Sequence, residues 1–107
     1  MVVDEEFLEL YVLMCRTISK PVRLKIIQAI GTGKRNVSSL QKELDIPMSN
    51  LSNHLNDLYR SGVLAKEKQG NFVFYSLTDP ELLEGIDRMQ GIVKCITSKR
   101  KFLSTAE

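Results

Sequence analysis

The sequence predicts a mainly helical fold that carries one small β-hairpin. Over most of the 107 residues, apolar side chains recur at intervals of three and four, the spacing that places them on one face of an α-helix. Residues 63–77 differ, because Val, Phe and Tyr are concentrated there and a glycine stands midway, as in two short antiparallel strands. The predicted order is helix, helix, helix, helix, hairpin, helix.

Two helices are expected before residue 31. Residues 4–18 form an amphipathic helix with acidic residues in its first turn and an apolar stripe made of Phe7, Leu10, Tyr11, Met14 and Ile18. Pro21 begins the second helix, because proline fits the first helical position and the residue before it avoids helical angles. This helix ends at Gly31-Thr32-Gly33.

A short helix, a tight turn and a longer helix follow. Ser38 and Gln41 form a Ser-x-x-Gln capping box that starts a helix ending near Leu44, and the turn is at residues 45–47. Residues 48–60 then form a helix, and Gly62 follows as its C-terminal cap. Its apolar face comprises Met48, Leu51, Leu55 and Leu58, and its opposite face comprises Ser49, Asn50, Ser52, Asn53, Asn56, Asp57 and Arg60.

The hairpin and the last helix complete the chain. Strands are expected at residues 63–68 and 71–77, joined by Gln69-Gly70. The last helix starts around residues 78–81, and its apolar stripe comprises Leu82, Ile86, Met89, Val93 and Ile96. We expect a single domain over residues 1–107, since the chain is too short for two.

Composition and charge restrict the possible functions. Apolar runs are far shorter than the roughly 20 residues that span a bilayer, and the start of the chain is acidic, so we expect a cytoplasmic protein with no membrane partner. Two cysteines 80 positions apart form neither a disulfide framework nor a metal knuckle. Residues 1–15 carry only acidic charges and residues 16–35 only basic ones. The basic segment suits either phosphate binding or attraction to the acidic segment across a dimer.

The order of a short helix, a tight turn, a helix with an uncharged polar face and a two-stranded ribbon is typical of a winged helix-turn-helix. Four segments, SKPVRLKII at 19–27, MSNLSNHL at 48–55, GVL at 62–64 and FYSL at 74–77, occur in one order and spacing. With them the chain resembles the ArsR family of bacterial and archaeal repressors over nearly its whole length. The resemblance implies a homodimer held by the first and last helices, which binds double-stranded operator DNA and releases it when an inducer binds elsewhere.

The polar face of the helix at 48–60 suits base reading independently of the resemblance. Ser and Asn side chains are short and carry donors and acceptors that can meet base edges or phosphates in the major groove. An ordinary solvated face usually carries Lys and Glu, but only Asp57 and Arg60 are charged here. The candidate DNA-binding residues are Ser49, Asn50, Ser52, Asn53 and His54. For His54, helix packing or a phosphate-facing position is the favoured interpretation over metal ligation.

The predicted hairpin would be the wing. Lys66 and Lys68 alternate on one face and flank the tip, so they can reach phosphates beside the groove, together with Gln69 and Asn71. Many relatives place an arginine just after the tip glycine, and Asn71 there implies a weaker insertion into the minor groove. Three further cations have two possible roles, contact with the DNA backbone or simple exposure to solvent. They are Arg23, Lys34 and Arg35.

The resemblance also indicates where an inducer would bind. The thiolate pair of metal-sensing relatives falls near residues 37–39, which contain no cysteine, and residues 81–96 contain no histidine for the zinc site of other relatives. We therefore expect no metal and no other cofactor. Some relatives detect oxidants, persulfides or arsenic with two thiols, which makes Cys15 and Cys95 candidate sensing thiols. Their helical phases leave it open whether they meet, and a purely packing role is the alternative.

The expected function is that of a sequence-specific DNA-binding transcriptional regulator, a repressor of the ArsR type. A winged-helix module that docks proteins is the alternative, because residues 36–77 carry four basic and four acidic side chains. An enzyme is not expected, because one histidine, no glycine-rich phosphate loop and no Ser-His-Asp arrangement leave little for a catalytic site.

Overall fold

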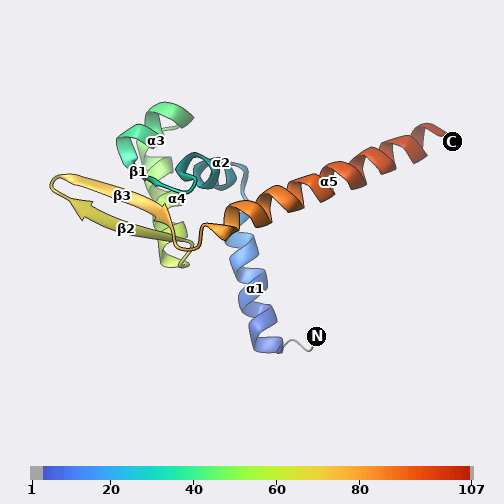
Figure 1. Cartoon of the computed structure of the whole chain (residues 1–107), viewed down its shortest axis with the longest axis horizontal. Coiled ribbons are helices and arrows are strands. Elements are labelled where there is room, and N and C mark those ends of the chain that lie inside the picture. Colours follow the sequence, from blue (N-terminus) through green and yellow to red (C-terminus); the bar gives the residue numbers. More distant parts are fainter. Residues whose placement is uncertain (1–3, 107) are drawn as a thin grey trace.

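Five helices and a three-stranded sheet follow one another in the computed structural model, which describes the backbone of residues 4–106 and the side chains of residues 4–100. The elements are α1 (Glu5–Ile18), α2 (Pro21–Ile30), β1 (Lys34–Asn36), α3 (Val37–Leu44), α4 (Met48–Arg60), β2 (Leu64–Gln69), β3 (Phe72–Leu77) and α5 (Glu81–Ala106). Helices α2, α3 and α4 gather around the base of the sheet, whereas α1 and α5 extend away from this body (Figure 1). The mainly helical fold with a small wing is confirmed.

The helix ends follow local signals in the sequence. Pro21 is at the first position of α2, and Gly31, with φ of 61°, ends it. Asp45, also left-handed, ends α3. At the end of α4, the Val63 backbone N–H donates to the Leu58 carbonyl over 3.0 Å, while Gly62 has φ of 89°. This arrangement is a Schellman motif, in which glycine tolerates the positive φ that reverses the chain into the wing.

The predicted cap of α3, Ser38, is wrong by two residues. Helix α3 begins at Val37, and its cap is Asn36, whose Oδ1 accepts a hydrogen bond of 2.8 Å from the Ser39 backbone N–H. Asparagine is among the best capping residues, and at this position it satisfies the N–H three residues ahead. Ser38 therefore lies within the first turn instead of capping the helix.

The sheet has one more strand than the predicted hairpin. Strand β1 pairs antiparallel with β3, with Lys34 opposite Ser76 and Asn36 opposite Phe74, and the strand order is β1-β3-β2. The wing turn is also shifted by one residue. Gln69 pairs with Phe72, so the two-residue turn is Gly70-Asn71, and Gly70 has φ of 62°. Glycine at the first turn position is the preference of a tight hairpin turn with positive φ there.

The core lies between α2, α3, α4 and the base of the sheet. Its buried residues are Ile26, Ile27, Ile30, Leu40, Leu51, Leu55, Leu58, Val63, Leu64 and Leu77. Three of the four residues predicted for the apolar face of α4 are in this set. Met48 is not, because it lies at the first position of α4, with 43% of its surface exposed.

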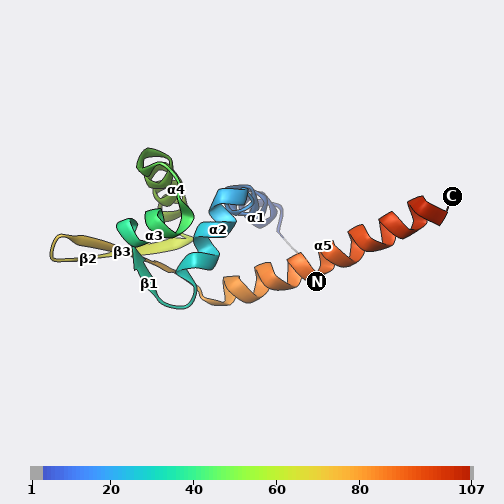
Figure 2. The same ribbon diagram turned by 90° about the horizontal axis from the view of Figure 1, so that it is seen from above.

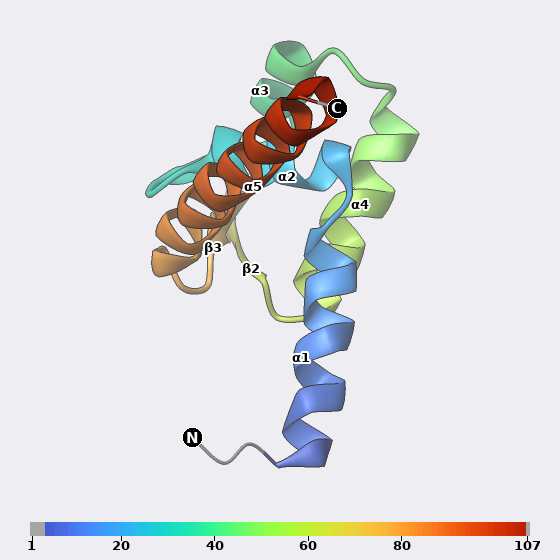
Figure 3. The same ribbon diagram turned by 90° about the vertical axis from the view of Figure 1, so that its right-hand side faces the viewer.

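Helices α1 and α5 keep most of their apolar surface exposed. Only Ile18 of α1 and the first turns of α5 pack against the core. Beyond them, α5 leaves the body without a neighbour along much of its length in Figure 2, and α1 does so in Figure 3. Their exposed large apolar residues are Phe7, Leu8, Leu10, Tyr11, Val12, Leu13, Met14, Met89, Ile92, Val93 and Ile96. Within residues 4–106, no helix is long and apolar enough to cross a membrane.

Candidate nucleic-acid interface

Helix α4 lies along one side of the body (Figure 3), and its exposed face is polar. Leu51, Leu55 and Leu58 are at most 1% exposed and anchor the opposite face in the core. The exposed side chains on the outer face include Ser49, Asn50, Ser52 and Asn53, all predicted from the sequence. None of the side-chain hydrogen bonds between described residues involves these four. Their donors and acceptors are therefore available to a molecule outside the domain.

The wing projects from the body as the hairpin of β2 and β3 (Figure 1). Lys66, Lys68, Gln69 and Asn71 are exposed, as the sequence predicted. Glu67 lies between the two lysines in sequence but on the other face of β2, where Gln69 donates a hydrogen bond of 3.0 Å to it. That hydrogen bond and the Lys34 ammonium 3.7 Å away lower the pKa of Glu67 below its usual range. Glu67 therefore pairs with Lys34 and not with Lys66 or Lys68.

The outer face of the sheet carries two aromatic residues that the sequence analysis did not single out. Phe72, directly after the wing turn, is 56% exposed, and its ring centroid is 6.5 Å from that of Phe74. The Lys34 ammonium lies 5.1 Å from the Phe74 ring centroid. Lys34 is consequently engaged on the outer face of the sheet by Phe74 and Glu67, and is not simply a solvated charge.

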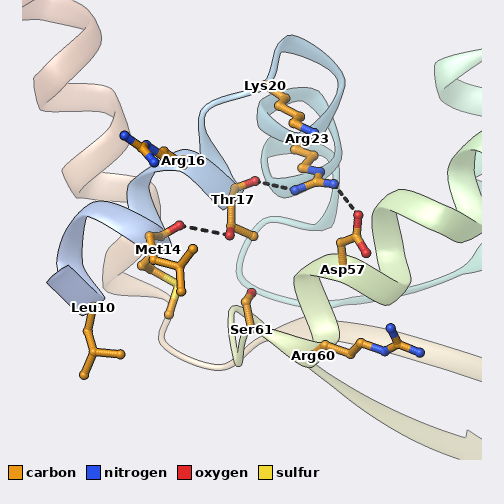
Figure 4. Close-up of a pocket in the computed structure, with 10 residues that line it drawn as sticks. Leu10, Met14, Arg16, Thr17, Lys20, Arg23, Asp57, Arg60 and Ser61 are labelled. Carbon is orange, nitrogen blue, oxygen red and sulfur yellow. Dashed lines mark hydrogen bonds and ion pairs between the residues drawn. The ribbon is translucent and has the colours of Figure 1, made fainter.

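Arg23 has neither of the two roles predicted for it, contact with the DNA backbone or exposure to solvent. It is only 5% exposed, so it is neither a solvated charge nor a contact to the DNA backbone. Its Nη1 donates to the Thr17 carbonyl over 2.9 Å, and its Nη2 pairs with the Asp57 carboxylate over 2.5 Å (Figure 4). Its Nε donates to Nδ1 of His54 over 3.0 Å. The guanidinium therefore joins α1, α2 and α4 from inside the domain.

Arg35 is also held by the fold. Its Nη1 donates to the Ala29 carbonyl over 2.9 Å, and its Nε donates to the Ser39 hydroxyl over 2.8 Å. A longer ion pair of 3.4 Å joins it to Glu43. These contacts connect β1 to α2 and α3, so Arg35 stabilises the junction and is not a free cation for DNA.

His54 takes the packing role. It is half-buried, and its Nδ1 accepts the hydrogen bond from Arg23, so that nitrogen carries no proton. Burial, followed by the nearby charges of Arg23 and Lys20, lowers the pKa of His54 from 6.5, and the Asp57 carboxylate opposes this only in part. The imidazole is therefore neutral at pH 7, and His54 is not part of the exposed α4 surface.

The two cysteines are not brought together within one protomer. Cys15 is half-buried on α1 and Cys95 is exposed on α5, and both are free. Cys95 is 14 residues after Glu81, which places it about 21 Å along the axis of α5 from its start. Helix α5 points away from α1 over this length (Figure 1). Any disulfide between Cys15 and Cys95 therefore requires two protomers or a large movement of α5.

Comparison with known proteins identifies the family. A family model described as a helix-turn-helix domain matches residues 18–67, from the end of α1 into the wing. The transcriptional repressor PagR of Bacillus anthracis is 34% identical over 84 residues, which are 78% of this chain and 77% of PagR. The chain belongs to the ArsR family of transcriptional repressors.

Solved structures agree with the ArsR-family fold. The crystal structure of Rv0081 from Mycobacterium tuberculosis has a TM-score of 0.79 and 28% identity, and the match covers 91% of this chain and 98% of Rv0081. The crystal structure of PagR matches with a TM-score of 0.66 and 30% identity, over 81% of this chain and 99% of PagR. The homodimeric winged helix-turn-helix domain Mb0332 of Mycobacterium bovis shares the fold, with 17% identity, 92% and 90% coverage and a TM-score of 0.67.

The predicted function is confirmed at this level. The protein is a DNA-binding transcriptional regulator of the ArsR family, whose members are regulators and not enzymes. Within the part of the ArsR-family chain that the structure describes, no three His, Cys, Asp or Glu side chains gather as they would around a metal ion.

Proposed function

We propose that the protein binds a specific operator as a homodimer and reads its bases with the exposed polar face of α4, defined as Ser49, Asn50, Ser52 and Asn53. One observation carries the proposal: α4 exposes an almost uncharged row of hydrogen-bonding side chains while its leucines are fully buried. These exposed polar side chains make no hydrogen bonds within the described part of the domain, so they contribute little to its folding stability. Asparagine can bind adenine through two hydrogen bonds in the major groove, which gives it base discrimination.

The wing supplies contacts that do not depend on sequence. Lys66 and Lys68 share one face of β2, and Gln69 and Asn71 lie at its tip, all exposed to an external partner. Ammonium groups in this position neutralise phosphates, while the amides hydrogen-bond to the backbone or to a groove edge. With Asn71 after the tip glycine, the wing carries less positive charge than a wing with arginine there. Membership of a family of DNA-binding regulators favours this function over protein docking.

The homodimer follows from the unpartnered surface of α1 and α5. Among the described side chains of these two helices, eleven large apolar ones are exposed in one protomer, including Leu10 at 64% and Ile96 at 58%. Contact of these side chains with water is unfavourable, and a twofold dimer covers them on both copies at once. The acidic first turn of α1 and the basic residues that follow it add complementary charge. We infer that residues 1–107 act as one winged-helix domain with dimerisation helices at both ends.

Control by thiols is the second part of the proposal. Cys15 and Cys95 lie on the two proposed dimerisation helices, and Cys95 is exposed. A disulfide forms only where the two Cα atoms approach within about 7 Å, and pairing between protomers achieves this without a large movement of α5. Such a bond, formed when an oxidant such as polysulfide accepts two electrons from the thiols, would fix α1 against the partner's α5 and change the spacing of two α4 helices that should lie about 34 Å apart.

The experiment compares two binding affinities of each variant. A duplex is first selected by the wild-type protein from a random-sequence library, and binding to it is then compared with binding to a scrambled duplex. Asn50→Ala and Asn53→Ala should each weaken binding to the selected duplex by about 1–3 kcal/mol for each base that the asparagine reads, with little change for the scrambled one. Gln28→Ala, an exposed amide on α2, is the matched control. Equal losses of affinity for both duplexes would contradict base reading by these residues.

A further inference from the structure

We propose that Arg23 is a positioning residue for DNA reading: from inside the domain it fixes α4 against the last turn of α1, so that operator specificity depends on a side chain that does not touch DNA. This inference rests on the proposed function of α4 and adds a determinant of specificity to it. Arg23 lies on α2, outside both the polar face of α4 and the wing.

The contacts of Arg23 reach both helices that matter for DNA binding. On one side its Nη1 donates to the carbonyl oxygen of Thr17, in the last turn of α1. On the other side its Nε and Nη2 contact His54 and Asp57, which are three residues apart on α4. Residues spaced by three share a helix face, so the guanidinium holds α4 at two points along one side. Figure 4 shows Arg23 between Thr17 and Asp57.

The burial of Arg23 makes this link rigid. Among the described side chains, Arg23 is the one charged residue that is buried, with 5% of its surface exposed. Each of its guanidinium nitrogens, Nε, Nη1 and Nη2, donates a hydrogen bond. A guanidinium is planar and its donors diverge in fixed directions, so moving one partner disturbs the other two bonds. A buried charge without its partner is strongly unfavourable, which opposes any rotation of α4 away from α2.

His54 contributes to the link only in its neutral form. Its Nδ1 accepts from Arg23, whereas a protonated imidazole has a proton on both nitrogens and repels the guanidinium. The charged groups acting on it are Arg23 of α2, Lys20 before α2 and Asp57 of α4. The two cations lower the pKa of His54 and so keep the acceptor available at neutral pH.

The effect on DNA reading follows from the position of α1. If α1 belongs to the dimer interface, Arg23 connects that interface directly to the helix that carries Asn50 and Asn53. Removal of the link would let α4 turn or shift relative to the twofold axis. Base contacts require donors and acceptors aligned within a few tenths of an ångström, whereas phosphate contacts by long side chains tolerate such shifts. Specific binding should therefore suffer more than non-specific binding.

The test uses two variants of the link and one matched control. Arg23→Lys keeps the charge but has one terminal nitrogen, which cannot serve all three acceptors. Asp57→Ala removes one acceptor that is 51% exposed and leaves Arg23 with His54 and Thr17, so this variant serves if Arg23→Lys does not fold. Glu43→Ala is the control, because it removes an equally exposed carboxylate, also 51%, from an arginine ion pair on α3. The affinities of all variants are measured at a temperature where each variant has the same helix content as the wild type by circular dichroism.

We expect Arg23→Lys and Asp57→Ala to lower affinity for the selected duplex roughly tenfold, with less than about a twofold change for the scrambled duplex. Glu43→Ala should leave the ratio of the two affinities unchanged. An equal decrease for both duplexes would mean that Arg23 only supports folding, and an unchanged ratio in folded variants would overturn the proposal. The asparagine variants separate the two proposals when the Arg23 and Asp57 variants leave the ratio of selected to scrambled affinity unchanged. If Asn50→Ala and Asn53→Ala also leave this ratio unchanged, α4 does not read bases. If they lower it, only the role of Arg23 is wrong.

Discussion

The Lys66 ammonium nitrogen lies 4.4 Å from the centroid of the Tyr59 ring, so a cation of the wing is held against the last turn of α4. Cation–π contacts at exposed sites contribute about 0.5–1 kcal/mol. Lys68 has no such contact with an aromatic ring among the described residues. The two wing lysines therefore differ: Lys66 orients the wing relative to α4, while Lys68 is the freer of the two to meet a phosphate.

Lys68→Ala should weaken binding to selected and scrambled duplexes alike, because a phosphate contact carries no sequence information. The slope of log affinity against log salt concentration should decrease by about 0.9, since one phosphate is no longer neutralised. Lys66→Ala should change the slope less, since part of that side chain is engaged by Tyr59. Fluorescence anisotropy at several salt concentrations measures both slopes, with Lys25→Ala on the exposed side of α2 as control. An unchanged slope for Lys68→Ala would mean that this lysine does not bind a phosphate.

Folding stability should decrease in mild acid because of His54. Burial and Arg23 hold its folded pKa below 6.5, so the unfolded chain takes up a proton that the folded chain resists. The contribution to stability is fully present above pH 6.5 and is lost as the pH falls through the folded pKa. Urea unfolding at a series of pH values measures this. His54→Gln should show a smaller decrease in stability over the same interval, and an equal decrease in both proteins would contradict the assignment.

Charges placed in the exposed apolar surface should separate the protomers. Phe7→Glu and Val93→Glu each put a carboxylate into a surface that is about half exposed in one protomer and buried in the proposed dimer. Burying an unpaired charge is unfavourable by several kcal/mol, so both variants should sediment as monomers at concentrations where the wild type is a dimer. Lys42→Glu, on the exposed side of α3, should leave the dimer intact. A wild-type protein that sediments as a monomer at micromolar concentration would exclude the dimer.

Any response of DNA binding to diamide, polysulfide or arsenite should require the two cysteines, because the chain has no others. We expect oxidation to lower the affinity of the wild type for its selected duplex, and the double variant Cys15→Ser, Cys95→Ser to be insensitive. Gel electrophoresis without reductant shows whether the disulfide joins two chains. An affinity that is constant under every treatment would make both cysteines packing residues.

Helices and their ends were largely predictable from the sequence, because they depend on local signals. Pro21, Gly31 and the leucines of α4 act within one or two turns of the chain, and the structure confirms the helices that they predict. The exposed side chains of α4 and of the wing followed from the same periodicity. The family resemblance added what periodicity does not contain, namely that this polar surface belongs to a DNA-binding regulator.

Features that depend on distant partners were not predictable. Strand β1 has three residues, Lys34-Arg35-Asn36, with no apolar alternation, and it exists only because β3 pairs with it. Arg23 resembled a surface cation until Thr17, His54 and Asp57 were brought around it from two other helices. The cap of α3 was harder to predict because Asn36 and Ser38 are both good capping residues. The hydrogen bond from the Ser39 backbone N–H to Asn36 shows that Asn36 is the cap.

The central claim, that the polar face of α4 and the wing form the DNA-binding surface, is tested most directly by mapping that surface in solution. Backbone amide resonances of the isotope-labelled homodimer are followed while the selected duplex is added. We expect the largest changes at residues 49–53 and 66–71, with little change at the exposed sides of α2 and α3. Changes concentrated on α5 or on the outer face of the sheet, with residues 49–53 unaffected, would contradict it.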